Sequence, residues 1–173
     1  TGRDLDVAVQ TEGWIAVQRE DGSEGYTRNG SLKTNENGML QTGNGLSVQG
    51  DGGSITIPPN MTVAIANDGT VSAISNNTLP GPPTVIGRIK LVNPPPENMV
   101  RAKDGLFNMA DGKPADADAS VKLVSGALEG SNVNVVQEMV NMISLARQFE
   151  YQMKMIQSAE NNADKASQLL ALN

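Results

Sequence analysis

The chain has 173 residues, no cysteine, no histidine and only five aromatic residues, and its formal net charge is −6. Without His or Cys, the sequence excludes Ser-His-Asp and Cys-His nucleophiles, imidazole or thiolate zinc sites, and disulfide bonds. The acidic balance argues against nucleic acid as a partner, and no apolar run reaches the ~20 residues that a membrane-spanning helix needs.

The glycines and prolines divide the chain into two parts. All 18 glycines and all nine prolines lie at or before Gly130, so the segment from Ser131 to Asn173 contains neither. Glycine and proline favour turns and disfavour helix interiors. We therefore predict a β-rich domain over residues 1–130 and a helix over residues 131–173.

Short β-branched runs predict the strands of the first part. In chain order, the predicted strands are Leu5–Gln10, Trp14–Arg19, Ile55–Pro58, Thr62–Ala66, Thr70–Ile74, Val85–Val92 and Val121–Leu128. Pairs such as Asp21-Gly22, Asn29-Gly30, Asn37-Gly38 and Asp68-Gly69 tolerate positive φ and close hairpins. The predicted fold class is mainly β, antiparallel and turn-rich, with a long C-terminal α-helix.

The polar residues of this first part form no pattern that is typical of an active site. Most acids lie beside glycine, where solvated turn residues are the simplest interpretation, so a secreted glycan hydrolase with paired carboxylates is a remote alternative. The aspartates lack the spacing of a calcium repeat, and Gly50-Asp51-Gly52-Gly53 lacks the Lys of a P-loop. We expect no catalytic residue, no metal and no cofactor.

A glycan-binding module is a further remote alternative, and it would need a platform of exposed aromatic side chains. Before the helix, the aromatic residues are only Trp14, Tyr26 and Phe107. Because Trp14 falls in a predicted strand, we expect its side chain to belong to the core.

The predicted helix carries a heptad pattern of apolar residues, which is typical of a coiled coil. The a and d positions hold Met139, Met142, Ala146, Phe149, Met153, Ile156, Ala163 and Leu170, with Glu160 and Ser167 interrupting the a positions. Either Asn132 or Asn134 could cap the helix. A helix of about 40 residues spans about 60 Å, which a domain of this size cannot cover, so we predict that this seam is a subunit interface.

Two stretches of the sequence resemble bacterial flagellar rod and hook proteins. The first runs from Gly2 to Val17 and continues in Tyr26-Thr27-Arg28-Asn29-Gly30. The second contains Ser131-Asn132-Val133 and continues through Glu138 to Glu150. On these motifs the chain is identified as a member of the flagellar basal-body rod protein family. It is most similar to the proximal rod branch, and a distal rod or hook-type subunit is the alternative.

The resemblance implies a structural, non-enzymatic subunit that assembles helically into the periplasmic drive shaft and transmits torque. Residues 1–130 would form the outer rod domain, and residues 131–173 would form the inner tube. The implied partners are other copies, other rod subunits and the flagellar export apparatus, which acts without a cleaved signal peptide. The family also has an N-terminal helix, and this chain starts after it, which leaves the helix seam without its usual intramolecular mate.

Overall fold

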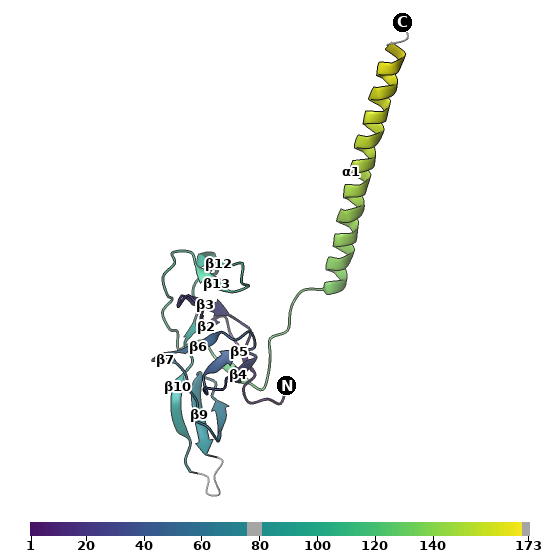
Figure 1. Ribbon diagram of the computed structural model, residues 1–173. Helices are drawn as coiled ribbons and strands as arrows, with labels where there is room; N and C mark the ends of the chain where they lie inside the picture. Colours follow the sequence, from purple (N-terminus) through teal and green to yellow (C-terminus); the bar gives the residue numbers. More distant parts are fainter. Residues whose placement is uncertain (76–80, 171–173) are drawn as a thin grey trace. The chain divides into compact units, whose positions relative to one another are not determined.

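A computed structural model describes the main chain of residues 1–75 and 81–170, and the side chains up to residue 165. The chain divides into two compact units, residues 1–129 and residues 130–173 (Figure 1). The described strands all lie in the first unit, and the second contains one long helix. This arrangement confirms the predicted fold class.

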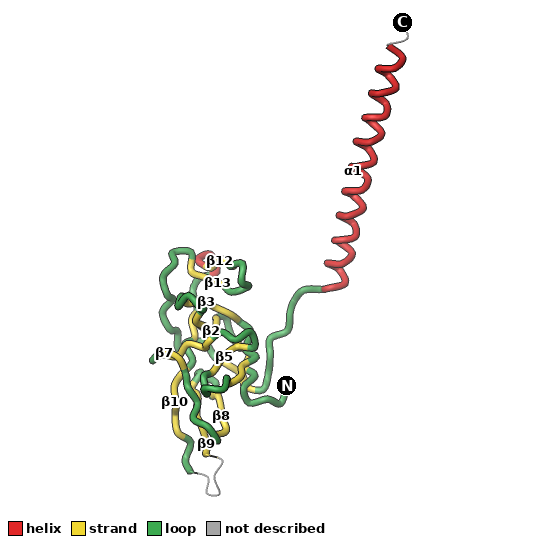
Figure 2. The backbone as a smooth tube through the Cα atoms, viewed as in Figure 1, coloured by secondary structure: helices red, strands yellow, loops and turns green. Residues whose placement is uncertain are grey.

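The first unit is built from short antiparallel strands (Figure 2). They are β1 Val7–Val9, β2 Trp14–Gln18, β3 Glu24–Thr27, β4 Leu32–Thr34, β5 Leu40–Thr42, β6 Ser47–Gly50, β7 Gly53–Ser54, β8 Met61–Ile65, β9 Thr70–Ser75, β10 Thr84–Arg88, β11 Leu91–Val92, β12 Met99–Arg101, β13 Phe107–Met109 and β14 Leu123–Ser125. A single 3₁₀ turn, Pro96–Asn98, precedes β12.

These strands form three sheets. The largest has the order β12-β13-β3-β2-β6-β5-β4, with β11 paired to β2 and β7 paired to β6. The second has the order β10-β9-β8, and the third is the pair β1-β14. Every described strand pairing is antiparallel.

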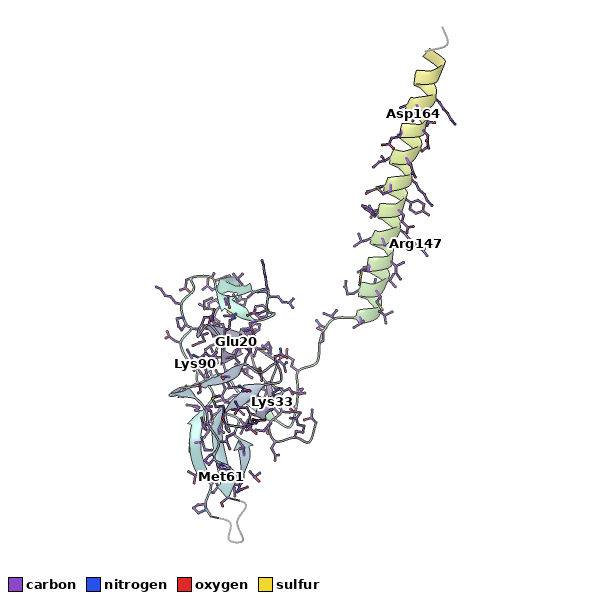
Figure 3. All side chains as sticks on the ribbon, in the orientation of Figure 1. Glu20, Lys33, Met61, Lys90, Arg147 and Asp164 are labelled. Carbon is purple, nitrogen blue, oxygen red and sulfur yellow. The ribbon has the colours of Figure 1, made fainter. Side chains whose placement is uncertain are left out.

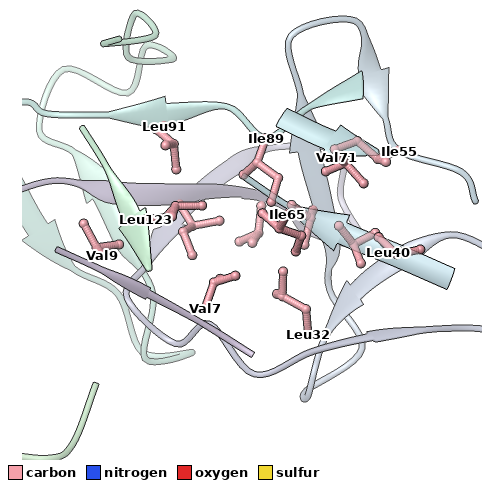
Figure 4. Close-up of a cluster of buried hydrophobic side chains, with 14 of the residues drawn as sticks. Val7, Val9, Leu32, Leu40, Ile55, Ile65, Val71, Ile89, Leu91 and Leu123 are labelled. Carbon is pink, nitrogen blue, oxygen red and sulfur yellow. The ribbon is translucent and has the colours of Figure 1, made fainter. Parts of the chain in front are cut away.

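One apolar cluster joins the three sheets (Figure 4). Val7 of β1, Leu32 of β4 and Val71 of β9 are fully buried in it, and so is Leu123 of β14. Full burial of an aliphatic side chain of this size contributes about 1.5 to 3 kcal/mol. The sheets therefore share one core and form a single folded body.

Three of the predicted Gly turns close hairpins. Gly22 joins β2 to β3, Gly38 joins β4 to β5, and Gly69 joins β8 to β9, with φ angles of 82°, 77° and 85°. These angles lie in the left-handed region, where a side chain is disfavoured. The prediction that these pairs close hairpins is confirmed.

The prediction for Asn29-Gly30 is wrong, because Gly30 has no positive φ and closes no hairpin. The main chain of Val7 lies against it, and the Val7 N–H donates a hydrogen bond of 2.9 Å to the Gly30 carbonyl. A Cβ atom at Gly30 would collide with the Val7 carbonyl oxygen. Glycine is needed here for the close approach of two backbones.

Two predicted strands differ from the structure. Ile55–Pro58 is not a strand, because its main chain makes only isolated hydrogen bonds to the β4–β5 hairpin. Leu40 N–H donates to the Ile55 carbonyl, and Ile57 N–H donates to the Gly38 carbonyl. Val85–Val92 is split into β10 and β11, since the chain passes from the second sheet to the largest one between Arg88 and Leu91.

The second unit consists of a short linker and helix α1, Val135–Leu170. Asn134 caps the helix, since its Oδ1 accepts hydrogen bonds from Val136 N–H (3.1 Å) and Gln137 N–H (3.2 Å). Asn132, the other candidate, lies outside this cap. The 36 residues of α1 span about 54 Å at 1.5 Å per residue. Within the described residues, no helix combines the length and apolarity that crossing a membrane requires.

The contact at Gly30 gives a direct test of the fold. Gly30→Ala should lower the free energy of unfolding by about 2 to 3 kcal/mol, because the new methyl group forces β1 away from β4. Urea unfolding followed by the fluorescence of Trp14 measures this change. Gly52→Ala is the matched control, since a Cβ there would meet no atom within 4 Å. Equal stability of the two variants would contradict the described approach.

Candidate assembly surfaces

Arg28 connects the two motifs that were singled out in the sequence. Its Nε donates a hydrogen bond of 2.6 Å to Oε2 of Glu129, which lies at the start of the second motif, two residues before Ser131. Its Nη1 donates a second one, 3.0 Å long, to the Gly13 carbonyl. Hydrogen bonds between two ionised groups are stronger than neutral ones. Arg28 therefore holds the point at which the chain leaves the first unit.

The same guanidinium covers the indole of Trp14. The Arg28 Cζ lies 5.8 Å from the centre of the Trp14 rings, a distance typical of a cation–π contact. Phe107 packs against the indole, with ring centroids 4.3 Å apart. Trp14 is half-buried at the edge of a small cluster around Tyr26. Its rings are thus occupied by protein contacts and do not offer a platform for a glycan.

The other residues of the first motif shape the turn that follows β3. Tyr26 is buried, its hydroxyl accepts a 2.7 Å hydrogen bond from Ala115 N–H, and burial raises its pKa to about 12. Thr27 Oγ1 accepts from Asn29 N–H, and Asn29 Oδ1 accepts from Ser31 N–H, both at 3.1 Å. Together with Gly30, these side chains fix the backbone around Arg28.

The second motif forms the linker at the start of the second unit and continues into the first half of α1. Ser131 Oγ accepts a hydrogen bond of 3.2 Å from Val133 N–H, while Asn132 and Val133 are exposed. The structure therefore brings Arg28 together with Glu129. Ser131, Asn132 and Val133 belong to the second unit.

The segments that begin and end the first unit lie side by side. Strands β1 and β14 pair in the register Val7↔Ser125 and Val9↔Leu123. Just before β1, the Asp6 carbonyl accepts a 2.7 Å hydrogen bond from Gly126 N–H. Strand alternation predicts a solvent-facing Asp6, yet it is buried, and its carboxylate lies 3.4 Å from Arg3 Nη1. Asp6 Oδ1 is buried without a hydrogen-bond partner, so the ion pair with Arg3 only partly offsets the burial of the charge.

Helix α1 exposes the predicted seam in the isolated chain. Five of its large side chains are between 52% and 66% exposed: Met139, Met142, Phe149, Met153 and Ile156. Ala146 and Ala163 are exposed as well, and Leu170 lies in the helix while its side chain is outside the described residues. Contiguous apolar surface of this kind marks interaction sites in soluble proteins.

Sequence reasoning missed a second group of apolar side chains on α1. Val136, Val140, Tyr151 and Met155 are 51% to 73% exposed and lie off the a and d positions. Writing the same heptad register around the whole helix would have revealed them. The apolar surface of α1 is therefore broader than a single coiled-coil seam.

The carboxylates with displaced pKa values belong to turns. Hydrogen bonds from Ser23 lower the pKa of Asp21, those from Thr70 lower that of Asp68, and those from Ser120 lower that of Asp118. The guanidinium of Arg19, 2.6 Å away, lowers the pKa of Asp104. A glycosidase needs one carboxyl group with a raised pKa as its general acid, and each of these pKa values is lowered.

No ligand set for a metal occurs in the described part of the chain. Within residues 1–75 and 81–170, no group of three or more Asp and Glu side chains could hold a metal ion.

Two protein-family descriptions match the chain. "Flagellar hook protein FlgE/F/G D1 domain" matches residues 8–73, and "Flagellar basal body rod FlgEFG protein C-terminal" matches residues 124–169. The first range runs from within β1 to within β9, and the second runs from within β14 through the linker and nearly all of α1.

Individual relatives are similar over the whole chain. The flagellar basal-body rod proteins FlgF of Salmonella typhimurium and Escherichia coli are each 44% identical to it, and each match covers 100% of this chain and 71% of the relative. The flagellar basal-body rod protein FlgG of Buchnera aphidicola (from Acyrthosiphon pisum) is 33% identical, over 98% of this chain and 66% of the relative.

The Arg28 contacts predict a measurable local effect. Arg28→Gln should lower the free energy of unfolding by about 1 kcal/mol and shift the Trp14 emission, because the ion pair and the stacked cation are both lost. Urea unfolding with fluorescence detection measures both quantities. Arg101→Gln, an exposed position on β12, is the control and should change stability by less than about 0.5 kcal/mol. Unchanged Trp14 emission in Arg28→Gln would disprove the contact.

The turn carboxylates predict how stability depends on pH. Their pKa values lie below the usual 3.8 in the folded unit, so the stabilisation is complete above the unfolded value and is lost as the pH falls through the lower folded values. Asp104→Asn should therefore flatten the decline of unfolding free energy below pH 4. Urea unfolding between pH 2.5 and 7 measures this decline, with Asp116→Asn as control. An identical decline in Asp104→Asn and the parent chain would refute the role of Asp104.

Proposed function

The chain belongs to the family of flagellar basal-body rod proteins, and we propose that it serves as a subunit of the proximal rod. As a member of this family it is a structural subunit of the flagellar rod. The proximal position is supported by the 44% identity to FlgF proteins, compared with 33% for a FlgG protein. This difference in sequence identity favours the proximal rod over the alternative, a distal rod or hook-type subunit.

The exposed apolar seam of α1 is the observation that carries the proposed mechanism. Five large apolar side chains of the seam are more than half exposed in the isolated chain. Their a and d spacing suits helix-to-helix packing of the knobs-into-holes type. In the assembled rod, α1 packs through this seam against other helices as part of a coiled coil.

The two units have different roles in the proposed assembly. Residues 131–173 supply the helix of the inner tube, and residues 1–130 form the outer domain. When many copies share helix contacts, twisting the shaft must disrupt numerous packed side chains at once. Torque is thus carried by interfaces, and the subunit needs no catalytic residue, metal or cofactor.

The partners and location follow from the same role. The subunit works in the basal body, in the periplasmic space, in contact with other copies of itself and with other rod subunits. It reaches that place through the flagellar export apparatus. Membership of the rod family supports this location, these partners and this route of export. The proposed mechanism involves neither nucleic acid nor a membrane-spanning segment.

Two substitutions in the seam test the assembly role. Phe149→Asp together with Met153→Asp should abolish rod assembly and swimming, because two charges would have to be buried in a helix-to-helix contact. Electron microscopy of isolated basal bodies and a motility assay measure the outcome. The unfolding of the first unit, followed through Trp14, should not change.

The matched control is Asn141→Asp together with Gln148→Asp, which adds the same charge to α1 at positions outside the seam. This variant should swim normally. Intact rods in the Phe149/Met153 variant would eliminate the seam as the assembly surface, and a loss of rods in the control would show that added charge alone is responsible.

A further inference from the structure

Strand β8 lies at the edge of its sheet, and part of its main chain has no partner strand. The order of the sheet is β10-β9-β8, so β8 pairs with β9 on one side only. At the turn between them, Ala66 N–H donates to the Thr70 carbonyl, and hydrogen-bonded pairs alternate along an antiparallel ladder. Ala64 is therefore bonded to β9, while the N–H and C=O groups of Met61 and Val63 point away from it.

These outward groups of Met61 and Val63 meet no main-chain partner within the described residues. Val63 is nevertheless only 8% exposed, and Met61, which is labelled in Figure 3, is half-buried. Buried main-chain groups in folded proteins almost always have a hydrogen-bond partner. The N–H and C=O groups of both residues are therefore available to an additional strand.

A groove lies beside this edge, and we name it the β8 groove. It has a volume of about 700 Å³, within the range of about 300 to 1,000 Å³ that is common for binding sites. It is lined by residues 2–5, by residues 34–38 at the β4–β5 turn and by residues 57–63. All of them belong to the first unit. Leu5, Ile57 and Val63 give the groove an apolar part.

The charged residues of the β8 groove are mainly acidic. Asp4 and Glu36 line it and are exposed, and none of the described ion pairs contains either residue. Arg3 lines the groove as well, but it pairs with the buried Asp6 and donates a hydrogen bond of 3.3 Å to the Leu32 carbonyl. Because Arg3 and Asp6 offset each other, the negative charges of Asp4 and Glu36 remain.

We propose that the β8 groove binds an extended peptide strand in which apolar and basic residues alternate. The strand adds to the free edge of β8 in antiparallel orientation, and two of its residues exchange main-chain hydrogen bonds with Met61 and Val63. Directly opposite residues of a ladder share a face, so these two residues are apolar. The residues between them are basic and face the exposed acids. Neither α1 nor its seam takes part, so the inference goes beyond the proposed function.

The same features exclude other classes of occupant. A helix uses its own main-chain groups internally, so it would leave those of Met61 and Val63 without partners. A small apolar molecule would do the same. Phosphate-bearing ligands would be repelled by Asp4 and Glu36. A basic peptide strand satisfies the main-chain groups, the apolar lining and the charge together.

Binding of a synthetic peptide tests the proposal. The labelled heptapeptide Ser-Val-Lys-Val-Lys-Val-Ser is titrated with the full chain, and fluorescence anisotropy measures the dissociation constant. It should bind at least tenfold more tightly than Ser-Val-Glu-Val-Glu-Val-Ser. Equal affinity for the two peptides, or no binding of the lysine peptide at millimolar concentration, would overturn the proposal.

Methylated peptides test the main-chain hydrogen bonds separately from the charge. In the proposed register, the amides of the valines point toward β8 and those of the lysines point away. Methylating the valine amide nitrogens should therefore weaken binding at least tenfold, whereas methylating the lysine amide nitrogens should change it less than twofold. The reverse order, or equal effects, would show that the peptide does not add to β8 as a strand.

A charge exchange on the chain provides the third arm. Asp4→Lys together with Glu36→Lys should weaken binding of the lysine peptide at least tenfold and make the glutamate peptide the tighter ligand. The matched control is Glu20→Lys together with Glu97→Lys, which changes the net charge equally at exposed positions outside the groove. Equal loss of affinity in both variants would mean that the peptide responds only to net charge, and the β8 groove would be the wrong site.

Hydrogen exchange locates the bound peptide. The lysine peptide should slow exchange of the Met61 and Val63 amides at least tenfold, while the Ala64 amide, which is already bonded to β9, should change little. Unchanged exchange at Met61 and Val63 while the peptide is bound would place the peptide elsewhere and overturn the proposal. If self-association of the chain displaces the peptide and protects the same two amides, a second copy occupies the groove, and the proposed occupant is wrong.

Discussion

The proposed function depends on one constraint, which is that α1 exposes a broad apolar surface in the isolated chain. In that function, other helices cover the surface. The seam leaves side chains such as Phe149 and Met142 about two-thirds exposed in the single chain, and burying each of them is worth about 1.5 to 3 kcal/mol. An isolated helix is marginally stable in water, so most helical stability comes from packing. In the proposed function, association is therefore part of how α1 becomes stable.

The first unit is stabilised by contacts within itself. Its core joins three sheets through residues such as Val7, Val71 and Leu123, so its own stability does not require a partner. The pairing of β1 with β14 and the contact of Arg28 with Glu129 fix both ends of the unit. Force applied through the linker therefore reaches a folded body through defined contacts, which suits a part that transmits torque.

The sequence predicted some of these features much better than others. The helix was predictable because Asn134 and a heptad pattern, interrupted only at Glu160 and Ser167, are local signals. Strands β3 to β6 are short and polar and escaped prediction. Ile55–Pro58 resembles a strand by composition, but too few main-chain partners reach it. The Arg28–Glu129 contact joins residues 101 positions apart, and the burial of Asp6 depends on Arg3 and Gly126. Such contacts depend on the tertiary fold.

Hydrogen exchange of the α1 amides over a dilution series measures the central claim most directly. If packing between copies stabilises α1, protection of residues 139–156 should rise at least tenfold as the concentration of the chain increases from the low micromolar to the millimolar range. Protection of the β-sheet amides should stay constant over the same range and serves as the internal reference. Protection of α1 that is independent of concentration would contradict the account.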